Sequence, residues 1–349
     1  MSDLPGPSVE NSGSVEITAP KKDEKGPPML IKTITLILLV ILFLTLIGCA
    51  QVDMGQPPLE VSPHGESPFR MGQIIEAESG STLDFDAFIG QLSRKDIIFI
   101  GEVHNHPTHH LIQIQIIQAL MARSDRVILA MEFFPVTKQA ALDHYLADQM
   151  TEDAFLKDVD WQHSWGYDYS LYRPLMLLAK QNRIAVIAIN APPEVVKKEA
   201  RQGLANLEPE ERALLAQDID LNQEAHRVYL QSIFEQHNHN DLKQFDYFYQ
   251  AQCSWEDTMA QNIAVNAKKR DGIFVVLAGN GHLIRKFGIP NRTFKRHPVP
   301  MATVLPFPLS GQVSIDPGIG DYLWFTDPYH HGSILAQHPD RKGKPKKEE

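Results

Sequence analysis

Four short, almost wholly apolar runs limit the fold of this chain more than any other feature. They cover residues 97–100, 126–130, 184–189 and 273–278. None shows the apolar–polar alternation of a strand with one wet face, so each is expected to be buried on both sides. A helical pattern at 84–92 precedes the first run, and two more, at 108–122 and 136–147, lie between the runs. Strands that alternate with helices predict βαβ units and a parallel sheet.

A long insertion separates the third and fourth runs. Residues 193–270 contain a helix start at Pro209, which two acidic residues follow. Phe248, Trp255 and Ile263 belong to an apolar stripe at helical spacing, which is typical of a helix that packs in a core. The predicted fold class is therefore α/β, a mainly parallel β-sheet flanked by helices, with a helical insertion between the third and fourth core strands.

Polar residues follow the predicted strands at the points where these end. Gly101-Glu102-Val103-His104 follows the first run, and Gly279-Asn280-Gly281-His282 follows the fourth. Glu132 and Asn190 follow the second and third. Because parallel strands bring their carboxyl ends to one edge, we expect His104, Glu132 and His282 to share a pocket. Such a set could bind a divalent transition metal or activate water, whereas a single histidine of this kind would more often cap a turn.

Two further groups of charged or titratable residues are open to two interpretations. His104, His106, His109 and His110 lie around Thr108, a plausible N-cap, so they are either ligands or exposed loop residues. Arg285, Arg292 and Arg296 form a basic patch that either holds an anionic group or is simply solvated.

The net charge of −10 argues against nucleic-acid binding. Cys253, one of two cysteines, is expected in the core.

The amino-terminal region predicts export and lipid anchoring. Residues 34–47 are nearly all apolar, too few for a comfortable membrane span, and lead to Gly48-Cys49. This resembles a bacterial lipoprotein box, in which Cys49 would carry the lipid; a short transmembrane anchor is the alternative. We therefore expect an N-terminal extension and signal peptide at 1–48, with Met29 as an alternative start. A tether at 49–81, a domain at 82–330 and a basic, disordered tail at 331–349 would follow.

Taken in order, the motifs resemble those of ChaN-like haem-binding lipoproteins of the Tiki/erythromycin-esterase-like superfamily, from about residue 83 to 296. They are Gly101-Glu102-x-His104 with His109-His110, Met131-Glu132-x-Phe134, Trp165 with Leu171-Tyr172-Arg173-Pro174, Ala188-Ile189-Asn190-Ala191-Pro192, Tyr249-x-Ala251-Gln252 with Trp255-x-x-Thr258-Met259-Ala260, Leu277-Ala278-Gly279-x-Gly281-His282 and Gly288-Ile289-Pro290. The resemblance implies haem at a dimer interface, with Tyr or His as the axial ligand.

Tyr172 is the leading candidate for that ligand, because a phenolate holds ferric iron and the adjacent Arg173 could lower its pKa or bind a propionate. Alternatively, both residues simply begin a helix. Arg285, Arg292 and Arg296 are further candidates for the propionates. Relatives that are hydrolases, some of them metal-dependent, use the two GxxH histidines and the strand-end glutamate, which here are His104, Glu132 and His282.

Two functions follow from these observations. The first is a haem-binding lipoprotein of the bacterial envelope, more often outer than inner membrane, which serves in haem or iron uptake or storage. It would be a homodimer and work with an outer-membrane haem receptor. The alternative is a metal-dependent hydrolase of peptides, esters or amides. Its catalytic residues would be Glu102, His104, Glu132 and His282, with His104, Glu132 and His282 as metal ligands.

Overall fold

The computed structural model describes residues 69–236, 242, 244–309 and 315–328, all of which belong to the second of two units, Gly55–Glu349. The predicted signal peptide, Cys49 and the tail at 331–349 lie outside these residues. Within the described part of the chain, no helix has both the length and the apolar character needed to cross a membrane.

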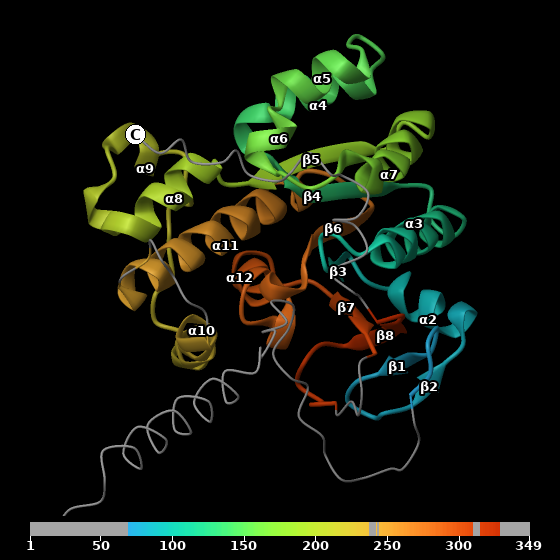
Figure 1. Cartoon of the computed structure of the whole chain (residues 1–349). Helices are drawn as coiled ribbons and strands as arrows, with labels where there is room; N and C mark the ends of the chain where they lie inside the picture. Colours follow the sequence, from blue (N-terminus) through green and yellow to red (C-terminus); the bar gives the residue numbers. More distant parts are fainter. Residues whose placement is uncertain (1–68, 237–241, 243, 310–314, 329–349) are drawn as a thin grey trace, which may run out of the picture. The chain divides into compact units, whose positions relative to one another are not determined.

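An eight-stranded sheet forms the centre of the described region (Figure 1). Its strands are β1 (Ile74–Glu76), β2 (Thr82–Leu83), β3 (Ile97–Glu102), β4 (Val127–Pro135), β5 (Ala185–Asn190), β6 (Ile273–Gly279), β7 (Met301–Pro308) and β8 (Tyr322–Thr326). They lie in the order β2-β1-β8-β7-β3-β6-β4-β5, and all pairs from β8 to β5 are parallel. β6 thus lies between β3 and β4, although it follows both in sequence.

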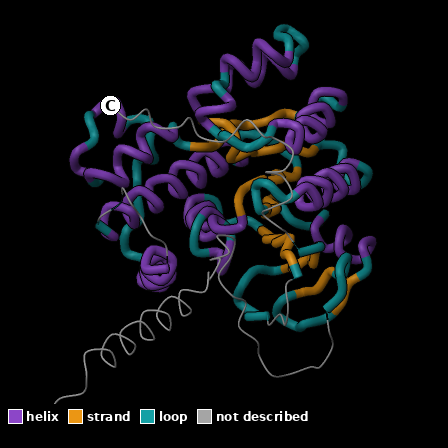
Figure 2. The backbone as a smooth tube through the Cα atoms, in the orientation of Figure 1, coloured by secondary structure: helices purple, strands orange, loops and turns teal. Residues whose placement is uncertain are grey.

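Helices flank the sheet on both faces (Figure 2). They are α2 (Phe85–Leu92), α3 (Pro107–Met121), α4 (Gln139–Leu146), α5 (Glu152–Asp158), α6 (Trp161–Ser164), α7 (Tyr169–Gln181), α8 (Pro193–Gln202), α9 (Pro209–Arg212), α10 (Glu224–Gln236), α11 (Phe245–Ala267) and α12 (Ile289–Arg296). Short 3-10 turns are η1 (Val136–Lys138), η2 (Leu204–Asn206), η3 (Asn280–His282) and η4 (Ile284–Lys286). The predicted fold class, including the helical insertion, is confirmed.

The two faces of the sheet build separate cores from alternate residues of the same strands. Ile98 and Leu277 pack in the core that contains α3 and α7, whereas Phe99 and Val276 pack against α11. A strand that contributes to both cores has no polar side, because side chains alternate between the faces. The apolar runs without alternation in the sequence follow from this arrangement.

Several element boundaries differ from the prediction. The expected tether at 49–81 contains β1, which pairs with β8, and Phe69 stacks on Phe325, so the folded region begins before residue 82. β7 was not predicted. The helix predicted at 136–147 is the turn η1 followed by α4. Thr108 lies inside α3, whose N-cap is His106, because Pro107 occupies the first helical position.

Candidate functional site

The two GxxH segments meet at the carboxyl edge of the sheet because β3 and β6 are neighbours, with Glu102 opposite Gly279. Their glycines make this approach possible. A methyl group on Gly279 would lie 2.8 Å from Cε1 of His104, and one on Gly101 would overlap the side chain of Asn280. Each segment thus leaves room for a polar side chain of the other, so any larger residue at either glycine would push the two apart.

Glu102 and His104 form a dyad. The buried Glu102 carboxylate lies 2.8 Å from His104 Nδ1 and also accepts a 2.8 Å bond from Gln113. Burial would lower the pKa of His104, but the hydrogen bond and charge of Glu102 outweigh it, so this pKa is raised. In the neutral ring, the proton on Nδ1 is donated to Glu102, so the lone pair that could bind a ligand is on Nε2. Among the described residues, no hydrogen-bond partner faces that atom.

Two aromatic rings lie beside the partly exposed side chain of His104. Its ring centroid lies 4.8 Å from that of Trp165 and 4.9 Å from that of Tyr167, and 25% of its side chain is exposed. Trp165 and Tyr167 are only partly buried. His104 is therefore a partly exposed imidazole whose Nε2 faces Gly279, beside two aromatic side chains that could contact a planar ligand.

His282 is enclosed by two carboxylates. Its Nε2 lies 3.3 Å from Glu132 Oε1, and its Nδ1 lies 3.2 Å from Glu256 Oε1. Burial disfavours the charged ring, but the two carboxylates outweigh this and raise the pKa of His282 to about 10. The Glu132 carboxylate also accepts the Gly279 amide at 2.7 Å, and despite its burial its pKa is lowered by His282 and His104.

The contacts bring His104, Glu132 and His282 into one cluster but do not favour the predicted metal centre. Both ring nitrogens of a protonated His282 are occupied by protons, so neither can be a ligand. Within the described ranges, no group of three or more His, Cys, Asp or Glu residues is arranged to hold a metal ion. The cluster is instead a network around His282, whose ring nitrogens face Glu132 on one side and Glu256 and Gln252 on the other.

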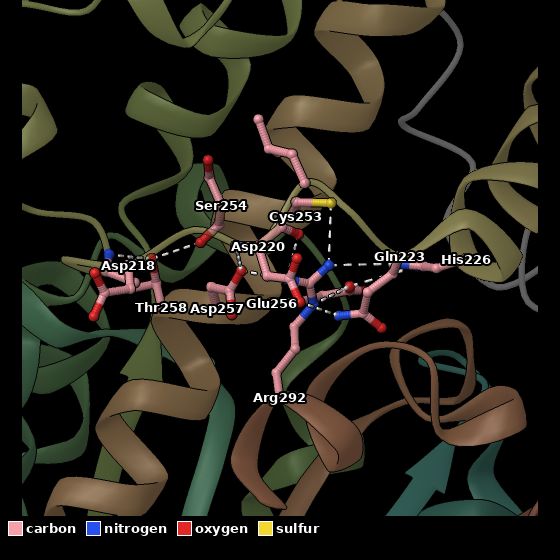
Figure 3. Close-up of polar contacts among 12 residues, drawn as sticks. Asp218, Asp220, Gln223, His226, Cys253, Ser254, Glu256, Asp257, Thr258 and Arg292 are labelled. Carbon is pink, nitrogen blue, oxygen red and sulfur yellow. Dashed lines mark hydrogen bonds and ion pairs between the residues drawn. The ribbon is translucent and has the colours of Figure 1, made fainter. Parts of the chain in front are cut away.

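Besides His282, Glu256 contacts Arg292 of α12. Figure 3 shows the buried ion network that Glu256 and Arg292 share with neighbouring residues of the helical insertion. Arg292 is fully buried and pairs with Asp257 and Glu256, and one of its amino groups lies 3.1 Å from the sulfur of Cys253. His226 lies 3.6 Å from Glu256. Cys253 is buried as predicted, and burial raises the pKa of its thiol to about 12.

The three arginines of the predicted basic patch do not form one open cationic surface. Arg292 cannot reach an external anion, Arg296 pairs with Asp257 at 2.8 Å, and Arg285 pairs with Asp316. Each of the three is paired with a carboxylate, Arg292 in the interior and Arg285 at the surface, so the sequence pattern of cations alone suggested a shared binding surface.

Tyr172 and Arg173 do not form the predicted ligand pair. The Tyr172 hydroxyl is buried 3.1 Å from Glu102 Oε1 and 3.0 Å from the His104 carbonyl oxygen, so it is a donor to both. Burial and the charge of Glu102 raise its pKa well above the usual value, which opposes phenolate formation. Arg173 points elsewhere and pairs with Glu152 at 2.8 Å. Both residues lie in α7, as the alternative interpretation stated.

The other histidines of the 104–110 segment are internal. His109 Nδ1 accepts the Val103 amide at 2.9 Å, and burial lowers its pKa well below the usual value. His106 Nε2 lies 3.1 Å from the Asp327 carbonyl, and His110 Nε2 lies 3.0 Å from that of His104. These contacts fix the backbone around His104 rather than provide further ligands.

Sequence reasoning did not assign four residues to the site: Trp165, Tyr167, Trp255 and Glu256, although Trp165 and Trp255 belong to the family motifs. Trp255 lies edge-on to the His282 ring, 4.6 Å between centroids, and donates its indole N–H to Asn190. This places the predicted strand-end Asn190 beside the cluster as well. A signal for Glu256 was present, since a charged residue interrupts the apolar face of α11 one turn before Ala260.

Comparison with known proteins places the chain in a superfamily and then in one of its families. The family model described as haem-binding uptake, Tiki superfamily, ChaN matches residues 88–293, more than half of the chain. The chain therefore belongs to the Tiki superfamily. Within it, the chain is a member of the ChaN haem-binding uptake family, as the sequence motifs indicated.

Individual relatives are distant. The structure "Cofacial heme binding to ChaN of Campylobacter jejuni" is 18% identical with a TM-score of 0.57, and the match covers 76% of this chain and 98% of that one. An erythromycin esterase mutant in its open conformation is 13% identical over 68% of this chain and 77% of that one, with a TM-score of 0.41. RETICULATA-RELATED 5, a chloroplastic protein of Arabidopsis thaliana, is 26% identical over 66% of this chain. The match covers only 34% of that protein.

Proposed function

We propose that this chain binds haem through His104 and serves in haem or iron uptake or storage. Membership of a haem-binding family supports haem as the ligand. The observation that carries the choice of residue is the Glu102–His104 dyad, whose Nε2 has no hydrogen-bond partner in the described region. A carboxylate on the far nitrogen of an imidazole fixes its tautomer and raises its strength as a ligand.

The residues around His104 fit such a group. His104 would hold the iron, and the rings of Trp165 and Tyr167 would contact the macrocycle. Haem supplies an iron centre that accepts an imidazole nitrogen. Glu102 keeps the proton on Nδ1, so that Nε2 stays free, and Gln113 keeps Glu102 in place. Tyr172 and Arg292 do not fit, since their polar groups are engaged inside the protein, and Arg285 and Arg296 are already paired with Asp316 and Asp257.

The second candidate, a metal-dependent hydrolase, has less support from the geometry. It requires His282 as a ligand, whereas Glu132 and Glu256 favour its protonated ring. A carrier function needs only one accessible donor and a planar surface, which His104 and its aromatic neighbours provide.

We further propose that the chain is anchored in the bacterial envelope, more often in the outer membrane, by lipid on Cys49. The apolar run at 34–47 before Gly48-Cys49 supports this. The solved Campylobacter jejuni relative is described as binding haem cofacially. Two haems face to face suit a homodimer, so we extend a dimeric arrangement, and delivery from an outer-membrane haem receptor, to this chain.

A hemin titration of the full chain in detergent tests the haem proposal. We expect a saturable shift of the Soret band that His104→Ala reduces at least tenfold. His163→Ala is the matched control, because that histidine is largely exposed and only pairs with Asp160 on the surface. Binding to the wild type that His104→Ala leaves unchanged would reject His104 as the ligand. Absence of a saturable shift in the wild type would reject the function.

A further inference from the structure

A cavity of about 530 Å³ lies at the opposite edge of the sheet from His104. Three turns line it, at 124–128 before β4, at 182–185 before β5 and at 269–271 before β6. It therefore lies at the amino ends of the strands, whereas the haem site lies at their carboxyl ends. Nothing in the proposed function uses this region.

Four exposed cations border the cavity, at least one from each turn: Arg126, Arg183, Lys269 and Arg270. In the part of the chain that the structure describes, none of them forms an ion pair with a carboxylate. Asp125 and Asp271 are the acidic residues of the lining, so the local charge is +2 in a chain with a net charge of −10. Cations gathered around a hollow without partners are arranged for an anion.

Arg183 has an unfavourable backbone conformation for its residue type. It follows α7 with φ of 54°, where the Ile184 amide bonds back to the Ala179 carbonyl at 2.9 Å. This left-handed position after a helix usually holds glycine, because a Cβ is disfavoured there. Arginine therefore stands where the fold would prefer glycine. Its side chain borders this cavity and two adjoining ones of about 630 and 790 Å³.

The backbone of the lining is held before any ligand arrives. The Arg126 carbonyl accepts the Ile273 amide at 3.0 Å, and its own amide bonds to Ser124. The Arg183 amide bonds to the Lys180 carbonyl at 3.2 Å. A lining whose backbone is already ordered loses less entropy on binding, so only the side chains need to adjust.

We propose that this cavity binds a compact anion with two or more phosphate groups. Guanidinium groups bind phosphate oxygens through paired hydrogen bonds, and three of the four cations are arginines. Several cations around one hollow favour a ligand that concentrates its charge, as phosphate does. The source is either a free phosphate compound or the headgroup of an anionic lipid, and both share this chemistry.

Calorimetric titration of the full chain with pyrophosphate, in low-salt buffer without other polyvalent anions, tests the free ligand. Cosedimentation with phosphatidylglycerol vesicles, against phosphatidylcholine, tests the lipid. The key variant is Arg183→Gly, which removes a cation and suits the backbone better, so it should melt no lower than the wild type. Lys286→Gly is its matched control. Lys286 is also positively charged with a positive φ, 58°, but it lies outside the cavity and pairs with Asp321.

We expect saturable binding to pyrophosphate or to phosphatidylglycerol that Arg183→Gly weakens at least tenfold and Lys286→Gly changes less than twofold. Added salt should weaken it as well. Binding to the free anion assigns the site to a soluble ligand, and binding to the vesicles alone assigns it to a headgroup. Equal binding by wild type and Arg183→Gly, or none to either probe, overturns the proposal.

Discussion

The enclosure of His282 by two carboxylates predicts how the stability of the fold depends on pH. The pKa of His282 is about 10 in the folded protein, against an ordinary value of 6.5. Since one unit is worth about 1.36 kcal/mol, the protonated ring contributes on the order of 5 kcal/mol to the free energy of unfolding. A raised pKa means that this contribution is complete below pH 6.5 and is lost as the pH rises to about 10.

The variant Glu256→Gln isolates this effect in urea unfolding of the full chain at pH 7 and pH 10. It removes one of the two carboxylates, so the pKa of His282 falls. The variant should then lose less free energy of unfolding than the wild type when the pH is raised. It also takes an ion-pair partner from buried Arg292, a change that costs about 3 to 5 kcal/mol at either pH. The difference in the free energy of unfolding between wild type and variant should therefore be largest at pH 7 and smaller at pH 10.

Glu211→Gln is the control, because Glu211 forms a part-exposed pair with Lys198 and should cost about 1 kcal/mol or less. Nitrogen NMR of the His282 ring gives a direct check, and we expect both ring nitrogens to carry protons at pH 8 in the wild type. A gap that stays the same from pH 7 to pH 10 would refute the reasoning, as would a ring that is neutral at pH 8.

Three further changes have defined outcomes. Gly279→Ala places a methyl group against His104 and should cost about 1 to 3 kcal/mol in urea unfolding and weaken hemin binding; unchanged binding would contradict the close packing. Tyr172→Phe removes a buried donor to Glu102 and should cost about 1 to 3 kcal/mol, yet leave the Soret band of bound hemin in place; a lost band would restore the phenolate ligand. Cys49→Ser should abolish incorporation of a palmitate analogue in bacterial cells, and persistent labelling would disprove the lipoprotein box.

Much of the sheet could be predicted because its central strands are covered on both faces and therefore wholly apolar. β7 escaped prediction because Pro306 and Pro308 argue against a strand. In the structure β7 pairs with β3 only from Met301 to Val304, so the prolines lie beyond the last of these pairs, where a missing amide hydrogen costs no bond to β3. β1 and β2 are too short to give a pattern.

The site was predictable only where position along the strands determines it. Residues at the carboxyl ends of the paired stretches of parallel strands must meet at one edge, which explains why His104, Glu132 and His282 could be grouped; Glu132 itself lies inside β4, one residue beyond its last pair with β6. Burial and pairing depend on distant segments, so the sequence could not show that Arg292 meets Glu256 inside the protein or that Tyr172 donates to Glu102. A sequence pattern of arginines is the same whether or not carboxylates from a distant part of the chain pair with them.

The place of β6 between β3 and β4 has a consequence for how the protein is made. The two earlier strands cannot complete the sheet without it, and the chain that separates β4 from β6 includes the whole helical insertion. Such long-range pairing slows folding, so a partly synthesised chain carries an open gap with two unpaired strand edges. Until β6 pairs with β3 and β4, Gly279 and His282 are absent from the sheet edge at which His104 lies. Haem loading is therefore expected to follow completion of the fold rather than to guide it.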